Sequence, residues 1–172
     1  MYQSTLHTKL NGVNMSDAEK CCELMDLKEW NGKTVEWKNK PFAKERYFAF
    51  FFMPLGADKI IMKKIAELSK KELWGNDMPR IIWRNEGLFG GEMLFALKKN
   101  DSSICTEKIS GKFFTMSYEG KGYGDIAQWH KAFGEDAKKR NLNIKERMTE
   151  YATCPLCAKE FGKIQAVIYG RL

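Results

Sequence analysis

The order of the predicted secondary-structure elements repeats once along this chain of 172 residues. In each half a strand and a glycine-containing turn precede an amphipathic helix, and two further strands follow it. The first half has strands at about 46–53, 80–84 and 92–97, with a helix from about residue 58. The second half has strands at about 112–118, 147–153 and 165–169, with a helix over about 126–137. The two halves share few letters, so the pattern repeats and the sequence does not.

This order predicts an α+β fold of two βαββ repeats, each an antiparallel sheet covered by one helix. We expect repeat one at about 44–99 and repeat two at about 107–172. Residues 1–43 are expected to form an N-terminal extension with a helix and a short strand. Two such repeats side by side would leave a shared cleft between their uncovered faces, which is where a ligand would bind.

Composition and charge exclude several classes of protein. No stretch reaches the ~18–20 uninterrupted apolar residues that span a bilayer, and the N-terminus lacks the pattern of a signal peptide. We therefore expect a cytoplasmic protein without a membrane partner, whose five cysteines are reduced thiols. The net charge of +7 raises the question of nucleic acid. However, the basic clusters fall on or after amphipathic helices, where they are typical of a solvated face, so no nucleic-acid partner is expected.

Acidic and aromatic residues in the predicted strands suggest a binding site. A lipophilic organic cation needs aromatic faces for its apolar body and a carboxylate to offset its charge. Glu150 stands in the middle of a strand beside Tyr151, and Glu92 begins the corresponding strand of the first half. The other aromatic candidates are Trp83, Tyr118, Tyr123, Trp129 and Tyr169. The alternative is that Glu150 points to water and the rings fill the core.

Two segments resemble a known family. Residues 113–123, with the letters FFTMSYEGKGY before a helix, are similar to the second repeat of GyrI-like small-molecule-binding domains. Residues 147–153, which run into a proline, resemble the Glu/Tyr-bearing strand of that family. The resemblance covers about residues 44–172. It implies a stand-alone domain that binds bulky, lipophilic and often cationic compounds in a multidrug-binding or effector-binding role, with a separate transcriptional regulator as one conceivable partner.

The same resemblance implies a second function. Some GyrI-like proteins are hydrolases that open strained cyclopropane-containing compounds with an acidic residue and an aromatic neighbour. Glu150 would then act as the general base that activates water, its pKa raised by burial, and Trp83 or Trp129 would position the substrate. No Ser-His-Asp set, P-loop or dinucleotide fingerprint points to another reaction class.

Cysteine and histidine give a weaker signal. Cys154 and Cys157 form half of a zinc-knuckle pattern in the link between the last two strands, but no second pair has the matching spacing. We therefore expect no metal and no cofactor, and interpret the pair as reduced cysteines in a tight turn. His130 lies on the apolar stripe of the second helix. Although haem-binding relatives share the duplicated design, we interpret it as a core or boundary histidine.

Overall fold

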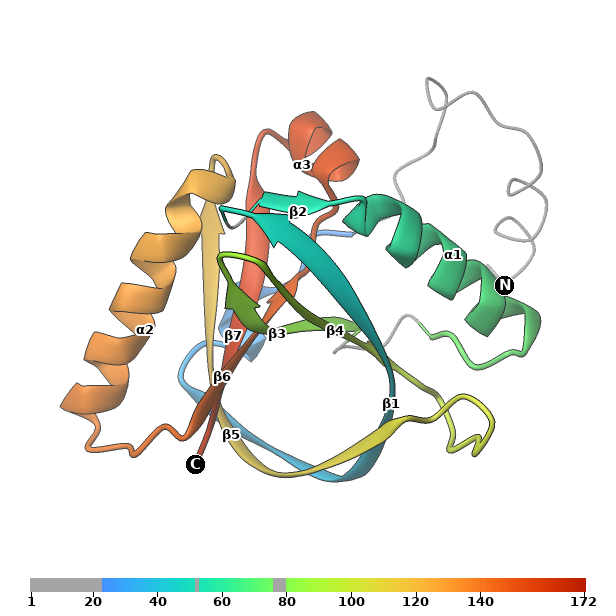
Figure 1. Cartoon of the computed structure of the whole chain (residues 1–172). Helices are drawn as coiled ribbons and strands as arrows, with labels where there is room; N and C mark the ends of the chain where they lie inside the picture. Colours follow the sequence, from blue (N-terminus) through green and yellow to red (C-terminus); the bar gives the residue numbers. More distant parts are fainter. Residues whose placement is uncertain (1–22, 52, 76–79) are drawn as a thin grey trace.

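The structure is a computed structural model, which describes residues 23–51, 53–75 and 80–172. These residues form a seven-stranded antiparallel sheet in the order β2-β1-β4-β3-β6-β7-β5, and β1 also pairs with β5. That pairing closes six of the strands into a barrel, and β2 extends it at one edge (Figure 1). The strands are β1 (Lys33–Phe50), β2 (Met53–Leu55), β3 (Ile81–Gly87), β4 (Gly90–Ala96), β5 (Glu107–Gly120), β6 (Glu146–Tyr151) and β7 (Ile164–Arg171).

The described ranges contain three α-helices, α1 (Ala57–Lys70), α2 (Ile126–Lys139) and α3 (Pro155–Phe161). α1 and α2 form where the apolar spacing predicts them, and they lie on opposite sides of the barrel (Figure 1). Each buries its apolar stripe against the outer face of the sheet, α1 over β1 and β4 and α2 over β5 and β7. None of the helices in these ranges is long and apolar enough to cross a membrane.

The prediction of two βαββ repeats around a shared cleft is wrong. The two halves of the chain meet at two edges, through β3 with β6 and through β1 with β5. Because both edges pair, the halves form one closed sheet, and no uncovered faces are left to enclose a cleft. The first strand is also much longer than expected and continues across the boundary placed after residue 43.

A bulge explains why β1 was predicted as two strands. A short strand was expected before residue 43 and a separate one from about residue 46, but β1 is continuous and its register against β5 only shifts between Trp37 and Lys40. Asn39 takes a φ of 49°, a left-handed conformation that asparagine tolerates better than most residues. An extra residue of this kind bends a strand and increases its twist, as barrel closure requires.

Apolar side chains fill the interior of the barrel. Successive residues of a strand point to opposite faces, so every second residue points inward. The buried inward set is Trp37, Phe42, Ile82, Leu94, Ile109, Phe113, Met148, Val167 and Tyr169. The segment before β1, which includes the 3-10 helix η1 (Leu27–Glu29), packs on this core, where the Trp30 and Tyr169 ring centroids lie 6.0 Å apart. Thr115 Oγ1 donates to the Trp30 carbonyl at 2.8 Å and helps to fix that segment.

Candidate functional site

Glu150 points into the barrel, and its side chain is only 1% exposed. It lies near the end of β6, opposite Ile82 on β3 and Val167 on β7. Its oxygens have two donors: Oε1 accepts from the Arg80 backbone N–H at 2.8 Å, and Oε2 accepts from the Tyr169 hydroxyl at 3.0 Å. The Arg80 guanidinium is near, with Nε 3.9 Å from Oε1. The alternative that Glu150 points to water is therefore wrong.

Burial dominates the electrostatics of this carboxyl. Loss of hydration raises the pKa of Glu150, while the hydrogen bond from the Arg80 N–H, the Arg80 charge and the Tyr169 hydroxyl act in the opposite direction. The pKa of Tyr169 is raised well above its ordinary value, first by burial and then by the adjacent Glu150. Glu150 thus has the raised pKa that the GyrI-like resemblance implied, but in a packed interior.

The structure separates Glu150 from most of the aromatic residues proposed to share its site. Tyr151 follows Glu150 on the same strand and so points to the outer face of the barrel. Trp83 is also on the outer face, where its ring centroid lies 5.7 Å from that of Tyr151. Tyr118 and Trp129 stack on each other at 5.8 Å within the α2 core. Of the expected rings, Tyr169 reaches the Glu150 carboxylate.

The other two candidate tyrosines, Tyr118 and Tyr123, lie away from Glu150 along the chain, on β5 and in the turn after it. Burial raises the pKa of Tyr118 to about 12, and its buried hydroxyl has no hydrogen-bond partner in the described part of the chain. Tyr123 belongs to the 3-10 helix η2 (Tyr123–Asp125), and its side chain lies outside what the structure describes.

The cysteine pair lies at the start of a helix. Cys154 is the residue before α3, and its Sγ accepts from the Cys157 backbone N–H at 3.4 Å, so the expected tight turn is instead a short helix. Among the described residues, no group of three His, Cys, Asp or Glu side chains could hold a metal ion. His130 lies at the edge of the α2 core, with Nε2 3.1 Å from Thr149 Oγ1, and burial lowers its pKa.

Charged side chains gather at the end of the barrel interior away from Glu150. Arg84 on β3 is their centre: it donates to Glu92 Oε2 from Nε at 3.0 Å and from Nη2 at 2.7 Å. Its Nη1 and Nη2 also donate to the two oxygens of Glu107, at 2.6 and 2.8 Å. We call this group the charged mouth; its members are Lys44, Arg84, Glu92, Glu107, Glu146 and Arg171.

The pairing in the charged mouth shifts the pKa values of its members. The hydrogen bonds from Arg84 lower the pKa of Glu107 and outweigh the effect of burial. At Glu92 burial opposes ionisation, but the hydrogen bond and charge of Arg84, with the charge of Lys44, still hold its pKa below the ordinary value. The pKa of Arg84 is raised, chiefly by its hydrogen bond with Glu107. All three groups are therefore charged at neutral pH.

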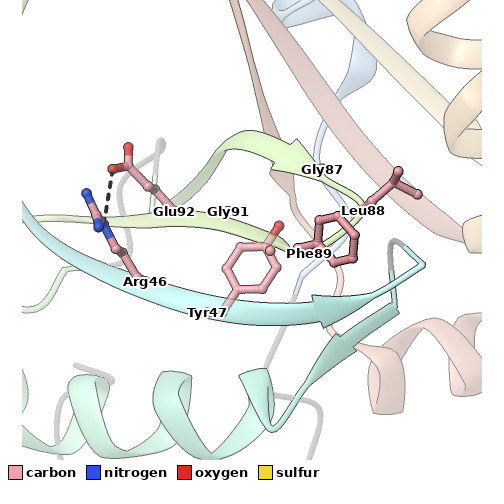
Figure 2. Close-up of a pocket in the computed structure, with 8 residues that line it drawn as sticks. Arg46, Tyr47, Gly87, Leu88, Phe89, Gly91 and Glu92 are labelled. Atoms are coloured by element: carbon pink, nitrogen blue, oxygen red, sulfur yellow. Dashed lines mark ion pairs between the residues drawn. The ribbon is translucent and has the colours of Figure 1, made fainter.

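An open groove of about 480 Å³ adjoins the charged mouth at Glu92. It runs along the β3–β4 hairpin and is shallow, with most of its volume open to solvent. Figure 2 shows Arg46 and Glu92 at one end, joined by an ion pair, and Leu88 and Phe89 at the other. Tyr47 lies between them, so one end of the groove is charged and the other is apolar.

Gly91 shapes the middle of this groove. A Cβ at Gly91 would lie 2.7 Å from the Tyr47 hydroxyl oxygen and 3.0 Å from its Cε1. Because glycine leaves this space empty, Tyr47 can lie across β4, and its ring meets Trp83 edge-on at 5.0 Å. No groove was expected at this hairpin from the sequence.

Sequence reasoning named Glu92 as a candidate but not the charged residues that the structure places beside it. Arg84, Glu107 and Arg46 carried a readable signal, because each is a charged residue with an apolar residue two positions away along its strand. Those apolar residues are Ile82, Ile109 and Phe48. The arrangement offers an ionised carboxylate beside exposed guanidinium, with an apolar surface for the rest of a ligand. Those are the parts needed to activate water and to stabilise negative charge on a substrate.

Comparison with known proteins corrects the expected family. A family model described as "Bacterial hydrolase" matches residues 13–172, whereas comparison with curated proteins and with solved structures finds no match. The GyrI-like resemblance is therefore wrong, as is the stand-alone binder of lipophilic cations that it implied. Its alternative, a hydrolase, agrees better with the match. Since the model spans nearly the whole chain, this protein belongs to the bacterial hydrolase family.

Proposed function

We propose that the protein is a hydrolase that acts in the groove beside the charged mouth, with Glu92 as the general base that activates water. Membership in the bacterial hydrolase family carries the reaction class. The position of Glu92 carries the assignment of the residue, since it lines the groove and belongs to the charged mouth. Its side chain is 13% exposed, against 1% for Glu150.

The lowered pKa of Glu92 limits the substrates it can serve. A carboxylate of this kind is ionised at neutral pH and can accept a proton, but it is a weak base. We therefore expect an electrophile with a good leaving group, such as an aryl ester, whose reaction needs little help from the base. The apolar end of the groove at Leu88 and Phe89 would hold the acyl or aryl part.

The reaction would proceed by direct attack of water. Glu92 takes a proton as the water oxygen attacks the ester carbonyl, and the carbonyl oxygen becomes negatively charged. Arg46, whose side chain is 83% exposed and whose Nε lies 3.9 Å from Glu92 Oε1, supplies positive charge for that oxyanion. Collapse of the intermediate releases the aryloxide and leaves the carboxylic acid, and the proton on Glu92 returns to solvent.

Glu150 is the competing carboxylate, and its raised pKa suits acid–base chemistry better. Its carboxylate is enclosed, however, with Arg80 and Tyr169 on its two oxygens. A catalytic acid or base must reach the substrate, so we assign Glu150 to the interior of the fold. The strained cyclopropane substrate depended on the GyrI-like resemblance and loses its support with it.

Hydrolysis of p-nitrophenyl acetate, butyrate and octanoate by the purified chain tests this function. We expect turnover that Glu92→Gln lowers by about 100-fold or more in kcat, the usual range for loss of a general base. Glu36→Gln, at an exposed position of β1, is the matched control and should retain full activity. Absence of turnover above the uncatalysed rate would refute the ester hydrolase, and an active Glu92→Gln would remove Glu92 from the role.

We also infer that the protein works in the cytoplasm. The inference rests on cysteine chemistry: Cys105, Cys154 and Cys157 are thiols, which persist in a reducing compartment. Fractionation of cells expressing the full chain, followed by thiol labelling, should find these thiols in the cytoplasmic fraction. Recovery of an oxidised chain outside the cytoplasm would contradict the inference.

A further inference from the structure

An exposed apolar surface covers the ends of two neighbouring hairpins. Phe51 is 70% exposed and Phe89 is 72% exposed, although phenylalanine is among the residues most often buried. We call this surface the hairpin tips; its members are Phe48, Phe50, Phe51, Met53, Leu55, Leu88 and Phe89, each at least 42% exposed. An apolar patch of this kind on a folded chain marks an interaction site.

The two hairpins form one continuous surface. β1 and β2 make the first hairpin, with Phe50 opposite Met53, and β3 and β4 make the second. They are joined at their ends, where the Ala49 N–H donates to the Phe89 carbonyl at 3.1 Å and Phe48 pairs with Gly90. The patch therefore belongs to one hydrogen-bonded part of the sheet, and its rings lie at neighbouring hairpin ends.

The backbone at Phe51 indicates that this exposure is not incidental. Two residues separate the paired Phe50 and Met53, and a turn this short favours asparagine and glycine because it needs positive φ. Phe51 occupies it with a φ of 47°, which is costly for a large side chain. Its ring meets the Phe50 ring edge-on at 4.8 Å, and both remain exposed. The turn thus holds an unfavourable residue that places aromatic surface in water.

The charges around the hairpin tips distinguish between possible partners. Arg46 is exposed on β1, and Lys59 and Lys63 are exposed on α1, the helix that follows β2. Asp58 is an exposed acid on the same helix. Two copies meeting through this surface would bring the same basic rims together. An anionic lipid surface would instead attract the rim, while aromatic rings enter the region between headgroups and acyl chains.

We propose that the hairpin tips attach the protein to the surface of an anionic lipid bilayer, with the rings of Phe51 and Phe89 entering the interface and the basic rim on the headgroups. The protein would lie on the membrane and not span it, and this proposal replaces the expectation from sequence that there is no membrane partner. The hairpin tips share Leu88 and Phe89 with the groove of the proposed hydrolase, and Arg46 belongs to both sites, but attachment to lipid needs no hydrolytic activity and can be measured separately from it.

Vesicle flotation of the full chain tests the proposal. The vesicles are phosphatidylcholine alone or phosphatidylcholine with roughly one quarter phosphatidylglycerol, enough to give the negative surface potential that attracts basic residues. We expect binding to the anionic vesicles, weaker binding to the neutral ones, and loss of most binding at about 0.5 M salt, where charges are screened. The double substitution Phe51→Ser and Phe89→Ser should weaken binding by about 100-fold, near tenfold for each ring.

Leu24→Ser is the matched control, because Leu24 is 42% exposed but belongs to the segment before β1. It should float like the wild type, and circular dichroism should show all variants folded. No binding to anionic vesicles, or equal binding by the double variant, would overturn the proposal. So would a concentration-dependent dimer in ultracentrifugation that the double variant abolishes, since the surface would then serve a second copy.

Discussion

Replacement of Gly91 by alanine tests how the groove is built. The new Cβ would lie 2.7 Å from the Tyr47 hydroxyl oxygen and 3.0 Å from both Tyr47 Cε1 and the Arg84 carbonyl oxygen. The Arg84 oxygen is backbone within β3 and cannot easily move, so the Tyr47 ring must shift. Tyr47 is 8% exposed and packs against Trp83, so the shift disturbs packing on the outer face of the barrel.

The expected cost follows from two opposing terms. Overpacking of a well-packed site costs about 1–3 kcal/mol. Alanine is favoured over glycine in a strand by about 0.5–1 kcal/mol, because glycine loses more backbone entropy on folding. We therefore expect Gly91→Ala to lower the free energy of unfolding by about 1–2 kcal/mol. Urea denaturation followed by tryptophan fluorescence measures it, and Gly122→Ala, whose Cβ meets nothing within 4 Å, is the control.

A double-mutant cycle with Tyr47→Leu separates this cause from others. Leucine removes the ring atoms nearest the new Cβ, so Gly91→Ala should cost about 1 kcal/mol less in that background, the size of coupling measured between touching residues. The Arg84 carbonyl contact remains, so the cost should not vanish. Equal costs in the two backgrounds would refute the steric explanation, as would a neutral Gly91→Ala.

Further predictions concern the charged mouth, the buried Glu150 and the contact between the N-terminal segment and the barrel. Arg84→Met should lower the free energy of unfolding at pH 7 by about 2–4 kcal/mol, because it leaves Glu92 and Glu107 without their main partner. The pKa values of Glu92 and Glu107 are lowered, so the stabilisation by their ion pairs with Arg84 is present above the ordinary pKa near 4.5 and disappears as pH falls through the folded-state values. The loss of unfolding free energy caused by Arg84→Met should therefore become smaller in acid. The pH dependence at Glu150 runs in the opposite direction, because its pKa is raised: its contribution to the free energy of unfolding is present below about 4.5 and is lost as pH rises. The stability of Glu150→Gln relative to wild type should therefore be lowest in acid and highest at high pH. Thr115→Val should cost about 1 kcal/mol, the worth of the hydrogen bond to the N-terminal segment at 2.8 Å. Urea titrations across pH 3.5–8.5 (roughly the range in which carboxyls with shifted pKa values titrate) check the first two, and wild-type slopes for the variants would contradict them.

Local pattern was enough to place the two longer helices. The apolar residues of α1 and α2 recur at helical spacing within single segments, so the faces they bury could be read directly. The closing pair β1–β5 joins Lys33 to Thr115 and Phe42 to Glu107. Nothing in the sequence of either segment indicates which distant strand it pairs with. A closed barrel was therefore mistaken for two separate repeats.

In the candidate site, too, local sequence predicts some features, while others depend on how distant strands pair. The raised pKa of Glu150 was expected only through the GyrI-like resemblance, and the strand itself left open whether the side chain is buried. Its separation from Tyr151 follows from strand alternation, but the sequence analysis grouped residues by position along the chain and not by the face of the sheet. The charged mouth depends on register: Arg84 meets Glu92 because β3 pairs with β4 at that point, and a shift of one residue would turn one of them outward.

Binding of a stable ester analogue tests the central claim most directly. Propylphosphonate, in which phosphorus takes the place of the carbonyl carbon in the tetrahedral intermediate of butyrate ester hydrolysis, can be titrated into labelled protein while NMR follows the backbone amides. The account predicts that the largest shifts fall on Tyr47, Phe89 and Glu92, which line the groove, and that Glu92→Gln changes them. Shifts centred on Glu150 and Tyr169 would contradict it, because the reacting carboxylate would then lie inside the barrel.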